Sequence, residues 1–70
     1  MKPLRLTYDP EANAAYLRLC EGKILESEEI SPGIILDFDA EGRILAIELL
    51  DARGQLPRLA LDGAVLPTAA

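Results

Sequence analysis

Four acidic residues and one glycine near the middle of the chain have almost the spacing of a calcium-binding loop. Asp37, Asp39 and Glu41 alternate with other residues, Gly42 follows directly, and Glu48 comes after five more residues. Calcium loops of the EF-hand type read D-x-[DN]-x-[DN]-G-x5-E, so only the glutamate at the fifth position departs from the pattern. In such a loop the acidic side chains converge on Ca²⁺ at about 2.4 Å, because a helix enters the loop and another leaves it.

The residues on both sides of this pattern argue against a calcium site. Pro32 and Gly33 disrupt any helix that would enter the loop. The run after Gly42 is apolar and β-prone, and in a strand Glu48 lies about 20 Å along the chain from the turn, at roughly 3.3 Å per residue. We therefore expect a hairpin turn with solvated acids, in which Glu48 cannot join the other ligands, and we assign no metal-binding residue.

Nucleophilic and metal chemistry lack the residues that they need. The chain has no histidine and a single cysteine, Cys20. A serine nucleophile therefore has no imidazole to activate it, and a zinc site would need several Cys or His ligands. We expect Cys20 to be a buried or half-buried structural thiol, and we assign no catalytic residue.

Paired carboxylates are the remaining source of chemistry. Glu26 and Glu28, like Asp37 and Asp39, are two residues apart and would share one face of a strand. A glycosidase-type pair needs a deep cleft, which a sheet of this size rarely builds. We expect a charged outer face instead. There is also no glycine-rich phosphate loop, so we expect no cofactor and no enzymatic activity.

Composition and charge limit the partners. Half of the 70 residues are hydrophobic, with no Trp, one Phe and two Tyr, so the core must be aliphatic. The net charge is −5, and the seven basic residues are scattered, which argues against direct binding of nucleic acid. A basic protein is the easier partner. The single cysteine and the lack of a long apolar run after Lys2 and Pro3 predict a reducing cytosol and no membrane span.

The first half of the chain reads as three strands. Residues 4–8 alternate with period two and predict a half-buried strand. Asp9 and Pro10 could begin a helix to Cys20, but residues 15–20 also alternate, and we favour a strand there. Residues 24–30 are the most polar strand candidate, and their charge suits a sheet edge because it discourages pairing with another molecule.

The acidic turn joins two apolar strands. Pairing Phe38 with Arg43 across residues 39–42 places Gly42 where a left-handed residue is wanted. This register predicts the cross-strand pairs Leu36–Leu45 and Ile34–Ile47 on one face. The opposite face would carry Ile35, Asp37, Ile44, Ala46 and Glu48.

The chain is long enough for one domain, residues 1–70, with a sheet core over residues 4–52 and a C-terminal extension over residues 53–70. Asp51 could cap a short helix after the last strand. Residues 56–66 could cover their own sheet or pack on another subunit. We predict a mainly β fold, an antiparallel meander sheet of four to five strands with a short C-terminal helix or turn. We also expect a homodimer, because one aliphatic sheet cannot cover both of its faces in 70 residues.

Three segments resemble a family of small prokaryotic proteins known as a domain of unknown function, number 2283 in that naming. The segments are YDPEA at residues 8–12, PGIILDFD at residues 32–39 and IELLDA at residues 47–52. The resemblance covers roughly residues 4–52. It implies a compact, mostly β fold with strand, turn and strand around YDPEA, and it implies no catalytic residues. Some members resemble the smaller partner in two-gene toxin–antitoxin arrangements.

These observations favour a non-enzymatic structural or protein-interaction module that associates with itself. The alternative is an antitoxin-like protein that binds a small basic partner through Glu26, Glu28 and Glu29. A third hypothesis is weak cation binding at the acidic hairpin turn.

Overall fold

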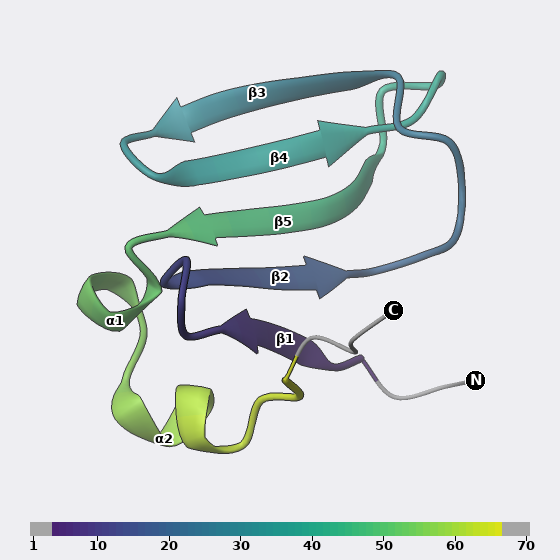
Figure 1. Cartoon of the computed structure of the whole chain (residues 1–70). Helices are drawn as coiled ribbons and strands as arrows, with labels where there is room; N and C mark the ends of the chain where they lie inside the picture. The colour runs from purple at the N-terminus through teal and green to yellow at the C-terminus, as the bar shows by residue number, and fades with distance from the viewer. Residues whose placement is uncertain (1–3, 67–70) are drawn as a thin grey trace.

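The computed structural model describes residues 4–66, and these form one antiparallel sheet of five strands followed by two short helices (Figure 1). The strands are β1 (Leu6–Asp9), β2 (Ala14–Arg18), β3 (Glu26–Ser31), β4 (Ile34–Phe38) and β5 (Ile44–Leu50), and the helices are α1 (Ala52–Gln55) and α2 (Arg58–Asp62). The predicted mainly β fold with a short C-terminal helix is confirmed. The part of the predicted extension beyond Leu66 lies outside the described residues.

The strand order is β1-β2-β5-β4-β3, which differs from a simple meander. Residues 19–25 carry the chain from β2 past the ends of β5 and β4 to the far edge of the sheet (Figure 1). In a meander β3 would lie between β2 and β4. All six residues of β3 are exposed, and five of them are Glu or Ser, so a central position would bury charge without partners. The predicted edge position of this strand is confirmed, and it is what breaks the meander.

The YDPEA segment forms a turn between two strands rather than a helix. The Asp9 carboxylate accepts hydrogen bonds from the backbone N–H groups of Glu11 at 3.0 Å and Ala12 at 3.4 Å, as a helix N-cap would. Asn13 then adopts a left-handed conformation with φ 51°, which ends the turn. The chain returns as β2, where Ala15 is buried. The preferred strand interpretation is therefore correct.

The central hairpin has a different register from the predicted one. The structure pairs Phe38 with Ile44, Leu36 with Ile47 and Ile34 with Leu49, and a bulge between Asp37 and Phe38 leaves Leu45 as an extra residue on β5. The predicted pairs of Leu45 with Leu36 and of Ile47 with Ile34 are wrong, because alternation within each strand cannot reveal an inserted residue. Leu45 is buried under the 19–25 connection, where a Cβ atom on Gly22 would lie 3.2 Å from its side chain.

The register divides the side chains between a polar and an apolar face of the sheet. On the polar face, cross-strand pairing lines up Tyr16, Arg18, Ser27, Ile35, Asp37, Ala46 and Glu48. On the apolar face it lines up Leu6, Tyr8, Ala15, Leu17, Ile34, Leu36, Phe38, Ile47 and Leu49.

The C-terminal helices cover only one part of the apolar face. Tyr8, Ala15 and Ala52 form a buried cluster, on which Leu56 and Leu61 pack. Residues 56–66 therefore pack on their own sheet, and the backbone of Val65 pairs with β1 at Thr7. Figure 1 shows both helices beside β1 and β2 and neither of them over β3 and β4. Among the described residues only Tyr8, Leu45 and three alanines are buried apolar side chains, which is a small core for a sheet of this width.

Asn13 joins the first turn to α1. Its side chain donates to the Asp51 carboxylate at 3.0 Å, accepts from the Arg53 backbone N–H at 3.0 Å and accepts from the Tyr8 hydroxyl at 3.2 Å. Asp51 itself is left-handed, with φ 51°, and makes no side-chain capping bond. The prediction that Asp51 caps the helix is wrong, because its carboxylate is turned toward Asn13.

Replacing Asn13 by alanine removes these bonds and places a Cβ-bearing residue without a polar side chain in the left-handed region. We expect Asn13→Ala to lower the free energy of unfolding by about 2 kcal/mol. Asn13→Gly tolerates the backbone conformation and should lose only about 1 kcal/mol, from the hydrogen bonds alone. Urea denaturation measures both values, and equal midpoints for Asn13→Ala and the unsubstituted protein would contradict this role.

Candidate functional site

The acids of the calcium-like pattern separate into a turn pair and a strand pair. At the turn, the Asp39 carboxylate accepts hydrogen bonds from the backbone N–H groups of Glu41 and Arg43, both at 2.9 Å. The Arg43 N–H is the main reason why the pKa of Asp39 lies below its ordinary value. Gly42 has φ 77°, as the predicted turn requires. The Asp39 side chain thus stabilises the hairpin turn by accepting hydrogen bonds from the backbone of the turn.

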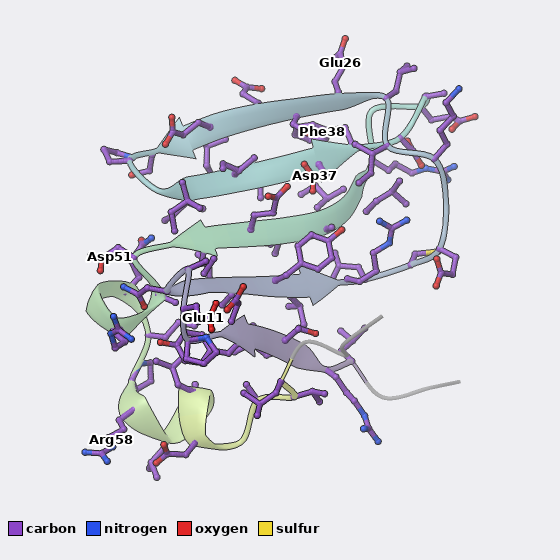
Figure 2. All side chains as sticks on the ribbon, in the orientation of Figure 1. Glu11, Glu26, Asp37, Phe38, Asp51 and Arg58 are labelled. Atoms are coloured by element: carbon purple, nitrogen blue, oxygen red, sulfur yellow. The ribbon has the colours of Figure 1, made fainter. Side chains whose placement is uncertain are left out.

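Asp37 is the buried acid of the molecule, and the expectation that all acids of the pattern are solvated is wrong for it. Its side chain is 1% exposed and lies on the polar face of β4 (Figure 2), where the Ser27 hydroxyl donates to its Oδ1 atom. Ala46, its cross-strand partner, is 0% exposed. Burial of a carboxylate is costly unless each oxygen has a donor, so the second oxygen of Asp37 needs a partner as well.

Glu48 is an acidic side chain that lies beside Asp37 on the polar face. Because Ile35 pairs with Glu48 and Asp37 pairs with Ala46, the side chains of Asp37 and Glu48 are diagonal neighbours on the polar face. The predicted register places Glu48 opposite Gly33, whereas in the structure it is opposite Ile35, two residues closer to Asp37. One residue of this shift comes from the pairing of Phe38 with Ile44 instead of Arg43, and the other comes from the bulge at Leu45. Distance along the chain was therefore the wrong measure, since the hairpin folds Glu48 back beside the first acid of the pattern.

The neighbouring Asp37 makes the Glu48 carboxyl group harder to ionise. The pKa of Glu48 is raised above its ordinary value of 4.5, mainly by its hydrogen bond to Asp37 and further by burial. Two ionised carboxylates cannot form such a bond, because neither has a donor. The Asp37 Oδ2 atom has no hydrogen-bond partner in residues 4–66. A proton on Glu48 would supply the missing donor to the buried carboxylate.

Arg18 and Tyr16 complete a polar cluster, which we define as Tyr16, Arg18, Ser27, Asp37 and Glu48. The Arg18 guanidinium donates to the Tyr16 hydroxyl at 3.0 Å and to the carbonyl oxygens of Cys20 at 2.9 Å and Gly22 at 2.6 Å. The Tyr16 hydroxyl is the main reason why the pKa of Arg18 is raised, and the Asp37 charge contributes to the same direction. The cluster thus holds the 19–25 connection against the sheet.

The cluster is better suited to holding a proton than a metal ion. The guanidinium of Arg18 supplies positive charge next to Asp37, which disfavours a second cation. Over residues 4–66, no group of three or more His, Cys, Asp or Glu side chains is placed to share a metal ion.

Cys20 lies at the start of the connection and is exposed, with its thiol directed at the Glu21 carbonyl oxygen at 3.3 Å. The prediction of a buried or half-buried thiol is wrong, because β2 ends at Arg18 and Cys20 has left the sheet.

The acids of β3 occupy the free edge of the sheet. Glu26 and Glu28 pair with Phe38 and Leu36 and so border the apolar face, and Figure 2 shows Glu26 extending away from the sheet. Glu29 is on the other face and accepts a hydrogen bond from the Gly33 backbone N–H at 2.9 Å. The three glutamates of the predicted basic-partner surface therefore point in two directions.

One apolar surface of the sheet is what we call the open apolar face. It consists of large apolar side chains that project from β2, β4 and β5 or follow directly after β2, none of them buried: Leu17, Leu19, Ile34, Leu36, Phe38, Ile44 and Ile47. Leu19 and Ile44 are 37% and 41% exposed although both belong to the sheet side that should face a core. Alternation predicted Ile34, Leu36 and Ile47 on one face. The prediction that Ile44 lies on the opposite face is wrong, because Ile44 pairs with Phe38. Only the position of the helices shows that neither of them covers this part of the sheet (Figure 1).

A hollow of about 450 Å³ lies between β1 and the helices. Its walls are Leu56, Leu61 and Pro10, and at its rim Arg53 donates to the Tyr8 hydroxyl at 3.0 Å. Arg58, also at the rim, is paired with Asp62 at 3.9 Å. These polar groups satisfy one another, so the hollow has no reactive arrangement.

Substituting Glu48 by glutamine tests the shared proton. A raised folded pKa means that the stabilisation is complete below pH 4.5 and is lost as the pH rises through the folded pKa of Glu48. The glutamine amide can donate to Asp37 at every pH. We therefore expect Glu48→Gln to raise the Tm more at pH 7 than at pH 4.

Exposed Glu26, changed to glutamine, is the matched control and should shift the Tm equally little at both pH values. A Glu48→Gln shift that does not depend on pH would rule out the shared proton.

The helices within residues 4–66 are all too short to cross a membrane. Comparison with curated proteins found no match, and comparison with solved structures found none either. Residues 5–53 match the model of a family described as protein of unknown function (DUF2283). The matched residues include β1 to β5 and the start of α1. The chain therefore belongs to the DUF2283 family.

Proposed function

We propose that this protein is a non-enzymatic interaction module that associates with a second copy of itself through the open apolar face. The observation that supports the proposal is the set of seven large apolar side chains on one side of the sheet, of which Leu19 and Ile44 are exposed and the other five half-buried. Monomeric proteins rarely expose contiguous apolar patches larger than a few hundred Å². We further propose a reducing cytosol as its location, which is consistent with one exposed cysteine and no cysteine partner.

A second copy suits this face better than an unrelated protein. The central row, Leu17, Ile47 and Leu36, contains no charged or hydrogen-bonding side chain that would select a particular partner. A flat apolar surface is complementary to itself, and a twofold pairing needs only one such patch. A stable dimer buries about 800 Å² per partner, which is the scale of one face of a small sheet.

The polar face supports a non-enzymatic role. Its buried acid accepts a hydrogen bond from Ser27, and its arginine donates to the tyrosine hydroxyl and to backbone carbonyl groups of the 19–25 connection. A catalytic acid or base needs an open approach to its substrate. The polar cluster serves the fold, and this leaves the apolar face as the functional surface.

Changing Leu36 to lysine should separate the two copies. Leu36 is at the centre of the open apolar face and half-buried in one chain, so a lysine can reach water there without unfolding the sheet. Sedimentation should give about twice the 7.6 kDa chain mass for the unsubstituted protein and the single chain mass for Leu36→Lys. Leu25→Lys, at a 59% exposed position before β3, is the control and should remain dimeric. An unsubstituted protein that sediments as a monomer at millimolar concentration would refute self-association.

A second candidate function is the binding of a basic protein at β3, as an antitoxin-like partner. β3 is an edge strand hydrogen-bonded only to β4, so its outer backbone groups are available to an extended segment. Glu26 and Glu28 stand beside those groups and would attract lysine or arginine side chains.

Capture of partners from native lysate tests this candidate. The double change Glu26→Gln and Glu28→Gln should abolish retention of a basic protein, whereas Glu11→Gln, in the loop before β2, should not. Equal capture by all three proteins would exclude the β3 edge.

A further inference from the structure

We propose that the two copies are related by a twofold axis parallel to the strands, so that α2 of each copy lies over β4 and β3 of the other. This inference rests on the proposed self-association and assigns its geometry. It follows from the uneven height of the apolar side, from one exposed leucine and from the distribution of charge.

The apolar side of the sheet is raised at one end and flat at the other. Ala52 of α1 and Leu61 of α2 pack on Tyr8, so both helices are on the apolar side next to β1 and β2. Nothing in residues 4–66 covers the same side of β4 and β3 (Figure 1).

Two twofold arrangements bring the apolar sides together. With the axis perpendicular to the strands, β1 faces β1 and helix meets helix, so two helical layers of roughly 10 Å each hold the sheets apart and the open face stays in water. With the axis parallel to the strands, the helical end of each copy lies over the flat end of the other. Only this second arrangement places the helices of one copy over β4 and β3 of the other.

Leu59 has the position that this arrangement requires. It is 84% exposed, more than any other large apolar side chain in residues 4–66. Leu61, two residues later in α2, packs inward on the Tyr8 cluster. Residues two apart on a helix point in nearly opposite directions, so Leu59 projects away from its own sheet. The flat half of a second copy is the apolar surface that it would meet.

The charges at the two ends of the apolar side differ. Glu26 and Glu28 border it at β3, whereas Arg53 and Arg58 of the helices at the other end are balanced by Asp51 and Asp62, and Arg58 is paired with Asp62 at 3.9 Å. The parallel axis places the glutamates over this balanced end. The perpendicular axis places Glu28 near Glu28, and repulsion between like charges disfavours that arrangement.

Cysteine cross-linking between singly substituted chains tests the geometry. In a Cys20→Ser background, Leu59→Cys and Glu28→Cys are made separately, mixed, allowed to exchange and oxidised. We expect a covalent dimer from the mixture and none from either protein alone, because position 59 of one copy meets position 28 of the other. A dimer from Glu28→Cys alone, or no cross-link in any sample, would overturn the geometry.

Sedimentation of the same proteins under reducing conditions separates the two proposals. A dimer that forms other cross-links would refute the direction of the axis but not self-association. A monomer would refute both proposals. As a second measurement, Leu59→Ser should raise the dimer dissociation constant at least tenfold. Leu25→Ser, at a position that alternation with Ser27 places on the polar side, should leave it unchanged.

Discussion

The structure depends on one constraint, which is that a single sheet of five strands has two faces and this chain can cover only part of one. The C-terminal helices bury Tyr8, Ala15 and Ala52 at the β1 and β2 end. Leu45 is the other large buried side chain, and it is covered by a connecting loop. Burial of apolar area is the main favourable term in folding, so a monomer of this shape is marginally stable. We propose that self-association adds the missing burial.

The polar face meets the same constraint in a different way. It has no helix above it, and it protects its centre with side chains that bond to one another. Asp37 is enclosed by Ser27 and Glu48, and Arg18 holds the 19–25 connection through carbonyl oxygens. The connection is also what carries β3 to the far edge of the sheet. The polar cluster therefore supports the topology.

The two faces together suggest how a member of the DUF2283 family can be short and still fold. The family match ends at residue 53, just after the sheet, so the features shared with the family are the strands and the polar face. Leu56, Leu59 and Leu61 lie beyond the match. α2 and the second half of α1 therefore lie outside the part of the chain that matches the family. These helices cover one end of the apolar face, and we propose that they also cover the other end of the partner's apolar face.

The sequence by itself determined the strands, the acidic turn at Gly42, the edge position of β3 and the absence of histidine chemistry, because alternation, turn residues and composition are local properties. Only the tertiary structure decided the strand order, the bulge at Leu45 and the meeting of Asp37 with Glu48. These depend on which strands pair and in which register, and the free energy of that choice comes from contacts between residues far apart in the chain. The four acids of the calcium-like pattern do not converge, and the closed hairpin instead brings two of them, Asp37 and Glu48, together on the polar face of the sheet.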